Sequence, residues 1–156
     1  RDTATNIIAF MHWGYEYHNF PNKEQRALSK WLHEQGADMV IGSHPHVVQP
    51  IEYYTSDKDT LGVTVFSLGN FISNQSQQGT EGGICTLTKP RNHPVRYQME
   101  PIKFYMYRPY EEGRRRYYVI PENLADSVMK DFHLTKSKNF FKKTDTILKS
   151  TKTFSF

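Results

Sequence analysis

The chain has 156 residues, of which 37% are hydrophobic and 14% aromatic, and this is enough apolar surface for one globular core. A single cysteine, Cys85, excludes an internal disulfide framework, and no stretch approaches the roughly 20 apolar residues of a membrane helix. The net charge of +4 favours an anionic partner only slightly, because ordinary solvated surfaces carry a similar excess. We therefore expect a soluble domain.

Two short apolar runs in the first 50 residues predict buried strands. The first covers residues 7–11 and leads into a turn at His12, and the second covers residues 37–42. With a helix between them, these strands predict a βαβ unit with parallel pairing and a right-handed crossover. Side chains that directly follow the two strands would then lie at the carboxyl edge of the sheet, where α/β folds bind ligands.

The helix between these strands has recognisable signals at both ends. Asn22, followed three residues later by Gln25, predicts a capping box. Gly36 predicts the end of the helix. The apolar residues that recur at helical spacing, and that predict the buried face of this helix, are Leu28, Trp31 and Leu32.

Two histidines flank one proline directly after the second strand. A residue before proline is disfavoured in helical backbone, so His44 is predicted to be extended. Alternate residues of an extended chain face the same way about 7 Å apart, so His44 and His46 can converge on one ion or anion. Neutral imidazole is the commonest protein ligand of transition metals, and the pair therefore predicts a metal site.

The rest of the chain has mostly β patterning. Further strands are predicted over residues 63–68, 84–88, 96–107 and 114–120, the last two as a hairpin around a turn at 109–113. Loops are predicted over residues 52–60 and 75–83, and a short helix over 123–132. We expect one domain over residues 1–135 and a polar tail over residues 136–156.

Three strand-to-loop junctions are predicted to meet at one edge of the sheet. They carry His12 with Glu16, His44 with His46, and Asn70. Three imidazoles and a carboxylate suit Zn²⁺, Mn²⁺ or Fe. Metal-bound water with a lowered pKa is the usual hydrolytic nucleophile, so this set of residues predicts a hydrolytic metal site.

The same junctions carry long and specific motifs. They are Met-His-Trp-Gly-x-Glu over residues 11–16, Gly-Ala-Asp-x-Val-Ile-Gly-Ser-His-Pro-His-Val-x-Gln-Pro over residues 36–50, and Ser-Leu-Gly-Asn-Phe over residues 67–71. These motifs resemble the bacterial capsule synthesis protein family, CapA or PgsA, linked to poly-γ-glutamate production. The resemblance covers roughly residues 6–90. That family is similar in turn to calcineurin-like metallophosphoesterases.

The resemblance implies a fold and a set of ligands. The implied fold is α/β, the C-terminal half of a metallophosphoesterase-like α/β/β/α sandwich, with a βαβ unit followed by mostly antiparallel strands. His12, His44 and His46 match metal-binding histidines, although the insertion of Ser43 departs from the phosphoesterase spacing. The Gly-Asp and Asn-His-Asp motifs of the family's N-terminal half have no counterpart here. Half of a two-metal cage would then be missing, so the isolated chain is expected to be inactive.

The resemblance also implies roles for two residues that match only the capsule family. Glu16 is a candidate proton-transfer group, and Asn70 is a second candidate catalytic residue. Other interpretations stay open for both. Glu16 is equally consistent with a solvated loop acid, and Asn70 with a turn residue that tolerates a positive φ.

Two classes of function follow from the resemblance. The first is capsule (poly-γ-glutamate) biosynthesis with metal-dependent hydrolysis by the full-length protein, using Mn, Zn or Fe. The second is a non-catalytic polymer-binding or assembly subunit of a capsule synthesis or export complex. The implied partners are an acidic polymer such as polyglutamate or a phosphorylated substrate, and other capsule synthesis subunits, with no nucleic acid. The parent protein would be membrane-anchored at the bacterial cell surface, and the location of this chain is left open.

The remaining candidates have simpler structural interpretations. Arg114 and Arg116 are predicted to share one face of the hairpin and to bind an acidic polymer, although charge that protects an edge strand explains them as well. Trp13 is interpreted as a packing residue. The histidines interpreted as hydrogen-bonded structural residues are His18, His33, His93 and His133.

Overall fold

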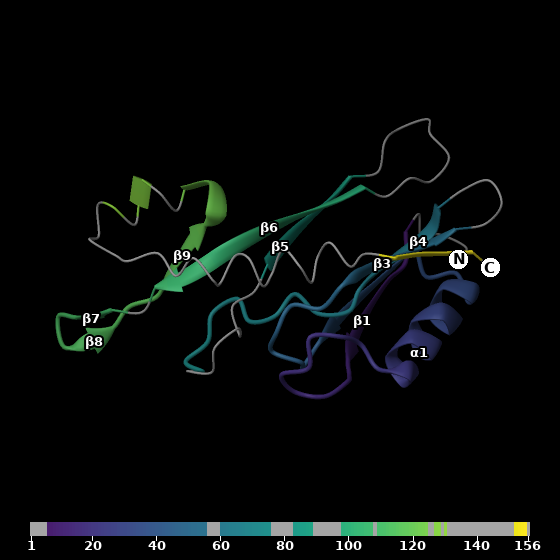
Figure 1. Cartoon of the computed structure of the whole chain (residues 1–156), viewed down its shortest axis with the longest axis horizontal. Helices are drawn as coiled ribbons and strands as arrows, with labels where there is room; N and C mark the ends of the chain where they lie inside the picture. The colour runs from purple at the N-terminus through teal and green to yellow at the C-terminus, as the bar shows by residue number, and fades with distance from the viewer. Residues whose placement is uncertain are drawn as a thin grey trace.

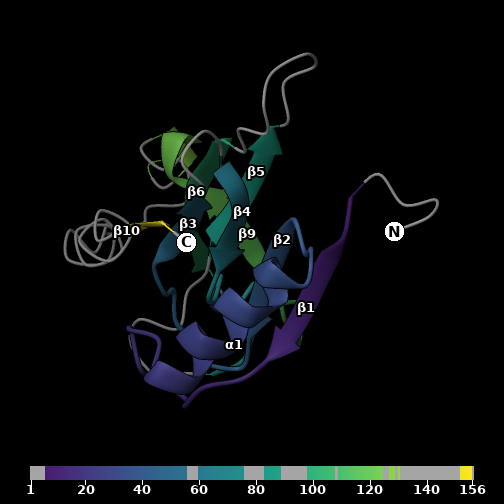
Figure 2. The same cartoon turned by 90° about the vertical axis from the view of Figure 1, so that its right-hand side faces the viewer.

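The computed structural model describes residues 6–55, 60–75, 83–88, 98–107, 109–124, 127, 128, 130 and 152–155. These residues form a mixed α/β structure in which α1 (Lys23–Glu34) lies on one side of a five-stranded sheet and a smaller sheet lies on the other (Figures 1 and 2). Within the described residues, no helix has both the length and the apolar character needed to cross a membrane.

The five-stranded sheet contains the predicted βαβ unit. Its order is β1-β2-β4-β3-β10, and its strands are β1 (Ile8–His12), β2 (Met39–Ser43), β4 (Thr60–Val65), β3 (Ile51–Thr55) and β10 (Lys152–Ser155). Strands β1, β2 and β4 are parallel, and β3 is antiparallel to β4. The register pairs His12 with Ser43, so β1 and β2 end at the same level of the sheet. This confirms the parallel edge predicted for His12 and His44.

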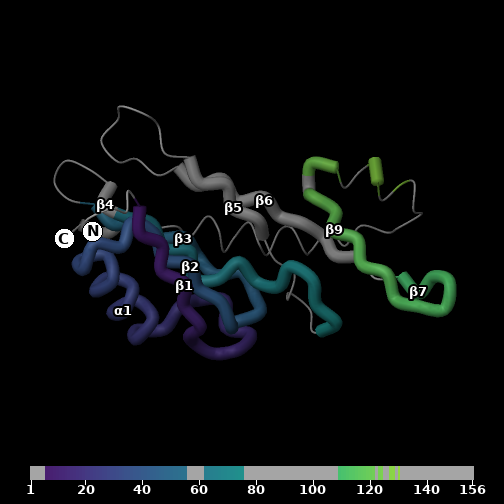
Figure 3. The backbone as a smooth tube through the Cα atoms, turned by 180° about the vertical axis from the view of Figure 1, so that it is seen from behind, coloured from purple at the N-terminus to yellow at the C-terminus, as the bar shows by residue number. Residues whose placement is uncertain are grey.

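The second sheet is antiparallel and contains the predicted hairpin. Strand β6 (Gln98–Tyr107) pairs with β5 (Gly83–Thr88) and with β9 (Tyr118–Pro121). Between β6 and β9 a small hairpin of β7 (Tyr110–Glu111) and β8 (Arg114–Arg115) projects from the end of the molecule remote from α1 (Figure 3). The predicted strand over residues 114–120 is therefore interrupted between β8 and β9.

The C-terminal predictions fall largely outside the described residues. The 3-10 helix η1 (Glu122–Leu124) covers the start of the helix predicted over residues 123–132, and little else of that segment is described. Residues 76–82 of the predicted loop lie outside the described part as well. Strand β10, in the predicted tail, pairs in parallel with β3, so residues 152–155 belong to the main sheet.

Helix α1 begins as predicted but packs through a different face. The Asn22 side chain accepts from the Gln25 backbone at 2.8 Å, and the Asn22 backbone donates to Gln25 Oε1 at 3.0 Å, which confirms the capping box. The predicted apolar face is wrong at Leu28, which is 38% exposed, and at Trp31, which is 52% exposed, whereas Leu32 packs against the cluster that contains Trp13. The residues that α1 buries are Gln25, Ser29 and His33. Polar partners on the sheet make burial of this polar face favourable.

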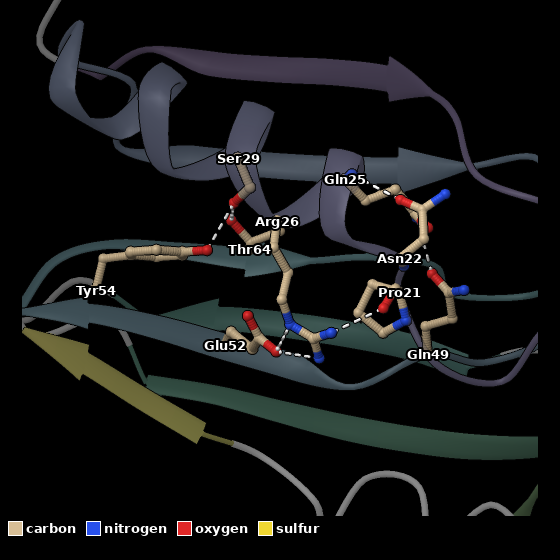
Figure 4. Close-up of polar contacts among 9 residues, drawn as sticks. All are labelled: Pro21, Asn22, Gln25, Arg26, Ser29, Gln49, Glu52, Tyr54 and Thr64. Atoms are coloured by element: carbon tan, nitrogen blue, oxygen red, sulfur yellow. Dashed lines mark hydrogen bonds and ion pairs between the residues drawn. The ribbon is translucent and has the colours of Figure 1, made fainter.

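A chain of hydrogen bonds fills the space between α1 and the sheet (Figure 4). The Ser29 hydroxyl lies 3.1 Å from the Tyr54 hydroxyl and 2.6 Å from that of Thr64. Thr64 in turn lies 2.8 Å from His33 Nε2, and His33 Nδ1 lies 2.7 Å from the Ala37 carbonyl oxygen. A carbonyl only accepts, so Nδ1 carries the proton of the neutral ring and Nε2 accepts from Thr64. The structural interpretation of His33 is thus supported.

A partly buried ion pair adds to the same layer. Arg26 Nε and Nη2 donate to Glu52 Oε1 at 3.0 and 2.8 Å, and Nη1 donates to the Pro21 carbonyl oxygen at 2.7 Å (Figure 4). Glu52 is 1% exposed, and its Oε2 atom has no hydrogen-bond partner among the described residues. The loop predicted over residues 52–60 is therefore wrong at its start, because those residues continue β3. This strand buries Glu52 against Arg26, and it buries Ile51 in the hydrophobic cluster that contains Val63 and Val65.

The prediction of a buried first strand is also wrong on one face. Ala9 and Met11 pack against the cluster that contains Trp13, but Ile8 is 47% exposed and Phe10 77% exposed. Within the described residues β1 is the edge of its sheet, with β2 as its one paired neighbour. The apolar run therefore predicted the strand correctly but not the exposure of its side chains. Periodicity does not reveal how many neighbouring strands a strand has.

Acid is expected to destabilise the fold through His33. Burial lowers the pKa of His33 below its ordinary value of 6.5. The unfolded chain then binds this proton more tightly than the folded chain, so the free energy of unfolding decreases as the pH falls below 6.5. Denaturant unfolding at a series of pH values should show this slope in the natural chain and less of it in His33→Gln. The control is His18→Gln, because His18 is exposed. An equal dependence of the free energy of unfolding on pH in all three proteins would contradict the assignment of this effect to His33.

Removal of Arg26 is expected to destabilise the fold by about 2–4 kcal/mol, because the nearly inaccessible Glu52 carboxylate loses its counter-ion. In a double-mutant cycle, the pair Arg26→Met with Glu52→Met should recover much of the loss from Arg26→Met alone. Urea unfolding gives all of these free energies. The control is Lys30→Met, which breaks an exposed pair with Glu34 at 3.8 Å. An Arg26 variant that costs no more than this control would refute the expectation.

Candidate functional site

A group of metal-ligand atoms gathers beyond the carboxyl ends of β1 and β2. It consists of Glu16, His44 and His46, whose ligand atoms all lie within 4.8 Å of one another. Glu16 is exposed, and both histidines are partly buried. Two imidazoles and a carboxylate are a suitable donor set for a first-row divalent ion. The structure thus brings together two of the three predicted ligands and adds the predicted catalytic residue Glu16.

The segment before Glu16 is held by the indole of Trp13. This side chain is 9% exposed, and its Nε1 atom donates to the Phe66 carbonyl oxygen at 3.0 Å. The indole crosses β2 at Gly42, where an added Cβ would lie 2.2 Å from Nε1. The Trp13 backbone also donates to the Ser43 carbonyl oxygen at 3.2 Å. Trp13 therefore packs, as interpreted, and fixes the chain that carries the site.

The backbone of the two ligand histidines lies in an unusual region. His44 has a φ of +93° and His46 a φ of +59°. The prediction that His44 is extended is therefore wrong. Tyr17 also has a positive φ, +63°, and its backbone donates to the Pro45 carbonyl oxygen at 2.8 Å. Such conformations cost roughly 1–3 kcal/mol each and cluster at functional sites.

This backbone still places the two rings next to each other. The ring centroids of His44 and His46 lie 6.0 Å apart. The Tyr17 ring lies 6.0 Å from that of His46. The predicted convergence of the two imidazoles is therefore present, although a turn with positive φ values produces it rather than an extended strand.

Asn70 and Gln75 support His46 from the end of β4. His46 Nδ1 lies 2.9 Å from Asn70 Oδ1, and Asn70 Nδ2 donates to Gln75 Oε1 at 2.8 Å. On the other side of the ring, Nε2 lies 3.6 Å from Glu16 Oε1. The turn before Asn70 takes its positive φ at Gly69, and Asn70 is not among the residues with positive φ. The interpretation of Asn70 as a positive-φ turn residue is thus wrong.

His12 lies beside the ligand group but is not part of it. Its ring centroid is 4.5 Å from that of His44, and its side chain is exposed at the end of β1. Sequence reasoning did not identify Gln75 or Tyr17 as neighbours of the site. Gln75 lies at the start of the loop predicted over residues 75–83, and Tyr17 lies just outside the Met-His-Trp-Gly-x-Glu motif, so only the tertiary structure shows that both are near the site.

The other predicted residues lie away from this group. Arg114 is exposed on β8, and Arg116 pairs with Glu112 at 2.9 Å. His18 is exposed with its ring 5.7 Å from Tyr15. His93 and His133 lie outside the described residues.

Comparison with known proteins places these residues in a family. Residues 1–75 match the model of the bacterial capsule synthesis protein family, PGA_cap. The chain is 36% identical over 100 residues to PGA biosynthesis protein CapA of Bacillus subtilis (strain 168), over 64% of this chain and 25% of that protein. It is 37% identical over 81 residues to capsule biosynthesis protein CapA of Bacillus anthracis, over 52% of this chain and 18% of that protein.

These matches cover a quarter or less of the length of either relative. The family match nevertheless includes every residue of the ligand group and its surroundings up to Gln75. Over residues 1–75, the chain matches the bacterial capsule synthesis protein family, and the likeness to both CapA proteins supports this match.

Proposed function

We propose that this chain is the metal-binding part of a capsule biosynthesis protein that hydrolyses its substrate at Glu16, His44 and His46. The observation that carries the proposal is the approach of His46 Nε2 to Glu16 Oε1 at 3.6 Å. In the neutral ring whose Nδ1 proton is donated to Asn70, both of these atoms present lone pairs. Two facing acceptors repel each other unless a cation lies between them, and a divalent ion would also use the adjacent His44.

The donor set suits Zn²⁺, Mn²⁺ or Fe, which accept imidazole and carboxylate ligands together. A bound ion of this kind supplies a Lewis acid and lowers the pKa of a coordinated water. The chain's own residues have separate tasks. Glu16, His44 and His46 would hold the ion, and the exposed His12 beside His44 is placed to contact an anionic substrate or to transfer a proton. In this proposal Glu16 acts as a ligand before any role in proton transfer.

We further propose that the described layers belong to a metallophosphoesterase-like α/β/β/α sandwich. Helix α1, the parallel strands and the second sheet correspond to three such layers. The exposed Ile8 and Phe10 support the proposal that another part of a longer domain packs beside β1. Ligands for a second ion would come from that part, so the isolated chain is expected to lack full activity.

A second candidate function is binding of an acidic polymer such as polyglutamate without hydrolysis. The observation in its favour is the exposed Arg114 on β8, at the tip of the β7–β8 hairpin. Arginine binds carboxylates through a planar fork of donors, so this tip suits a polyanion. Other capsule synthesis subunits remain proposed partners, and we propose that the parent protein is membrane-bound at the cell surface. We do not propose nucleic acid as a partner.

The metal proposal is tested on the full-length polypeptide that contains this chain. Titration with Mn²⁺ and Zn²⁺ by calorimetry should show weaker binding by at least about tenfold in His44→Ala and Glu16→Gln, since even outer partners of metal ligands contribute roughly 10–100-fold. Turnover of a generic phosphodiester should depend on the added ion and fall with the same variants. The matched control is His18→Ala, which should bind like the natural protein.

A full-length protein without metal-dependent turnover, whose ion affinity is the same in His44→Ala and His18→Ala, would exclude the metal hydrolase and leave the polymer-binding function.

Polymer binding predicts different effects for two neighbouring arginines. Arg114→Ala should weaken binding to polyglutamate by about two- to fivefold at low salt, as expected for an exposed charge. Arg116→Ala should have a smaller effect because Arg116 already pairs with Glu112. Fluorescence anisotropy with labelled polyglutamate at two salt concentrations measures both, because screening should reduce the difference. Equal affinity of Arg114→Ala and the helix variant Lys30→Ala would assign the hairpin to edge protection.

A further inference from the structure

We propose that Asn70, oriented by Gln75, is a positioning residue that holds His46 in the tautomer whose Nε2 atom is free to bind a metal ion. This inference rests on the proposed metal site. It assigns a task to the Ser-Leu-Gly-Asn-Phe motif, which the ligand group itself leaves unused.

The His46 ring is held in one tautomer by the hydrogen bond at its Nδ1 atom. A neutral imidazole has one N–H donor and one acceptor nitrogen, and only the acceptor can bind a metal. His46 Nδ1 faces the Asn70 carbonyl oxygen at 2.9 Å, and a carbonyl oxygen only accepts. Nδ1 must therefore carry the proton. The lone pair is left on Nε2, which faces Glu16 inside the ligand group.

The Asn70 amide presents its oxygen to His46 and its NH₂ group to Gln75. A primary amide can rotate by half a turn and exchange its oxygen with its NH₂ group. In the rotated form, the NH₂ group would donate to Nδ1 and would favour the opposite tautomer. Gln75 favours the observed form because its Oε1 atom accepts from Asn70 Nδ2 at 2.8 Å. This bond leaves the Asn70 oxygen facing His46.

The position of Asn70 is fixed by the turn that carries it. The turn after β4 takes a φ of +73° at Gly69, and the Gly69 backbone donates to the Ser67 hydroxyl at 3.1 Å. A bridge between Val48 and Leu68 ties this turn to the segment after His46. The Asn70 amide is therefore held beside the ring by backbone on both sides. His44, in contrast, has ring contacts but no hydrogen bond to its ring within the described residues.

The experiment reads the tautomer directly, with the full-length polypeptide labelled with ¹⁵N at histidine. Long-range ¹H–¹⁵N spectra without metal should show His46 protonated at Nδ1 in the natural protein. In Asn70→Ala the signal should shift toward the Nε2-protonated form, and affinity for Mn²⁺ or Zn²⁺ should fall by about tenfold or more. Asn70→Asp should retain the natural tautomer and affinity, because a carboxylate also accepts from Nδ1.

Two controls isolate the effect. Asn74→Ala removes an exposed amide from the same turn and should change neither readout. Gln75→Glu keeps an acceptor for Asn70 and should resemble the natural protein, whereas Gln75→Ala should shift the tautomer partly. The His44 signal in each variant reports any general disturbance of the site.

The outcomes separate this inference from the proposed function. An unchanged His46 tautomer and unchanged ion affinity in Asn70→Ala would overturn the positioning role, even in a protein that binds metal. A shifted tautomer in Asn70→Ala that Asn70→Asp restores would support it. If the natural protein binds no ion while the tautomer still responds in this way, the metal function fails and the positioning role of Asn70 stands.

Discussion

The indole of Trp13 crosses β2 at Gly42 and donates to the Phe66 carbonyl oxygen, and the geometry of the site depends on this contact. It joins the segment after β1 to the end of β4 across the strand between them. Only a residue without a side chain allows the crossing, since a Cβ at Gly42 would lie 2.1 Å from the Phe66 oxygen. The residues that follow Trp13 are therefore held over the carboxyl ends of the parallel strands.

The layer between α1 and the sheet is polar on both sides, which is unusual for a helix that covers a sheet. Ser29 and His33 reach Thr64, so these three buried side chains find partners, and their burial then costs little. The hydrogen bonds also restrict how α1 can be aligned on the sheet. A hydrogen-bond network matches at one register of helix and sheet, whereas apolar surfaces tolerate sliding, so the network is suited to hold one arrangement beneath the site.

The site combines local strain with outside support. His44 and His46 adopt positive φ values that few non-glycine residues take, and the Tyr17 backbone holds the intervening proline. The same turn leaves the rings of both histidines near Glu16. The strain is offset by the packing of the strands around it, and the result is a ligand group whose members come from two loops. Asn70 adds a third loop, so three strand ends contribute to one small volume.

Local sequence signals were enough to predict the βαβ unit, the capping box at Asn22 and the loops on which His12, His44 and Asn70 lie, because hydrophobic periodicity and capping chemistry are local. Other features depend on contacts between segments that are distant in the sequence, and local signals carry no information about those contacts. Leu28 and Trp31 have the spacing of a buried face, yet the polar partners on β3 and β4 draw the adjacent polar face of α1 inward. The backbone of His44 likewise departs from the extended form that Pro45 favours, because contacts with a distant loop override that preference. The pairing of Glu16 with His46, and the tautomer that Asn70 selects, arise only when these loops meet in space.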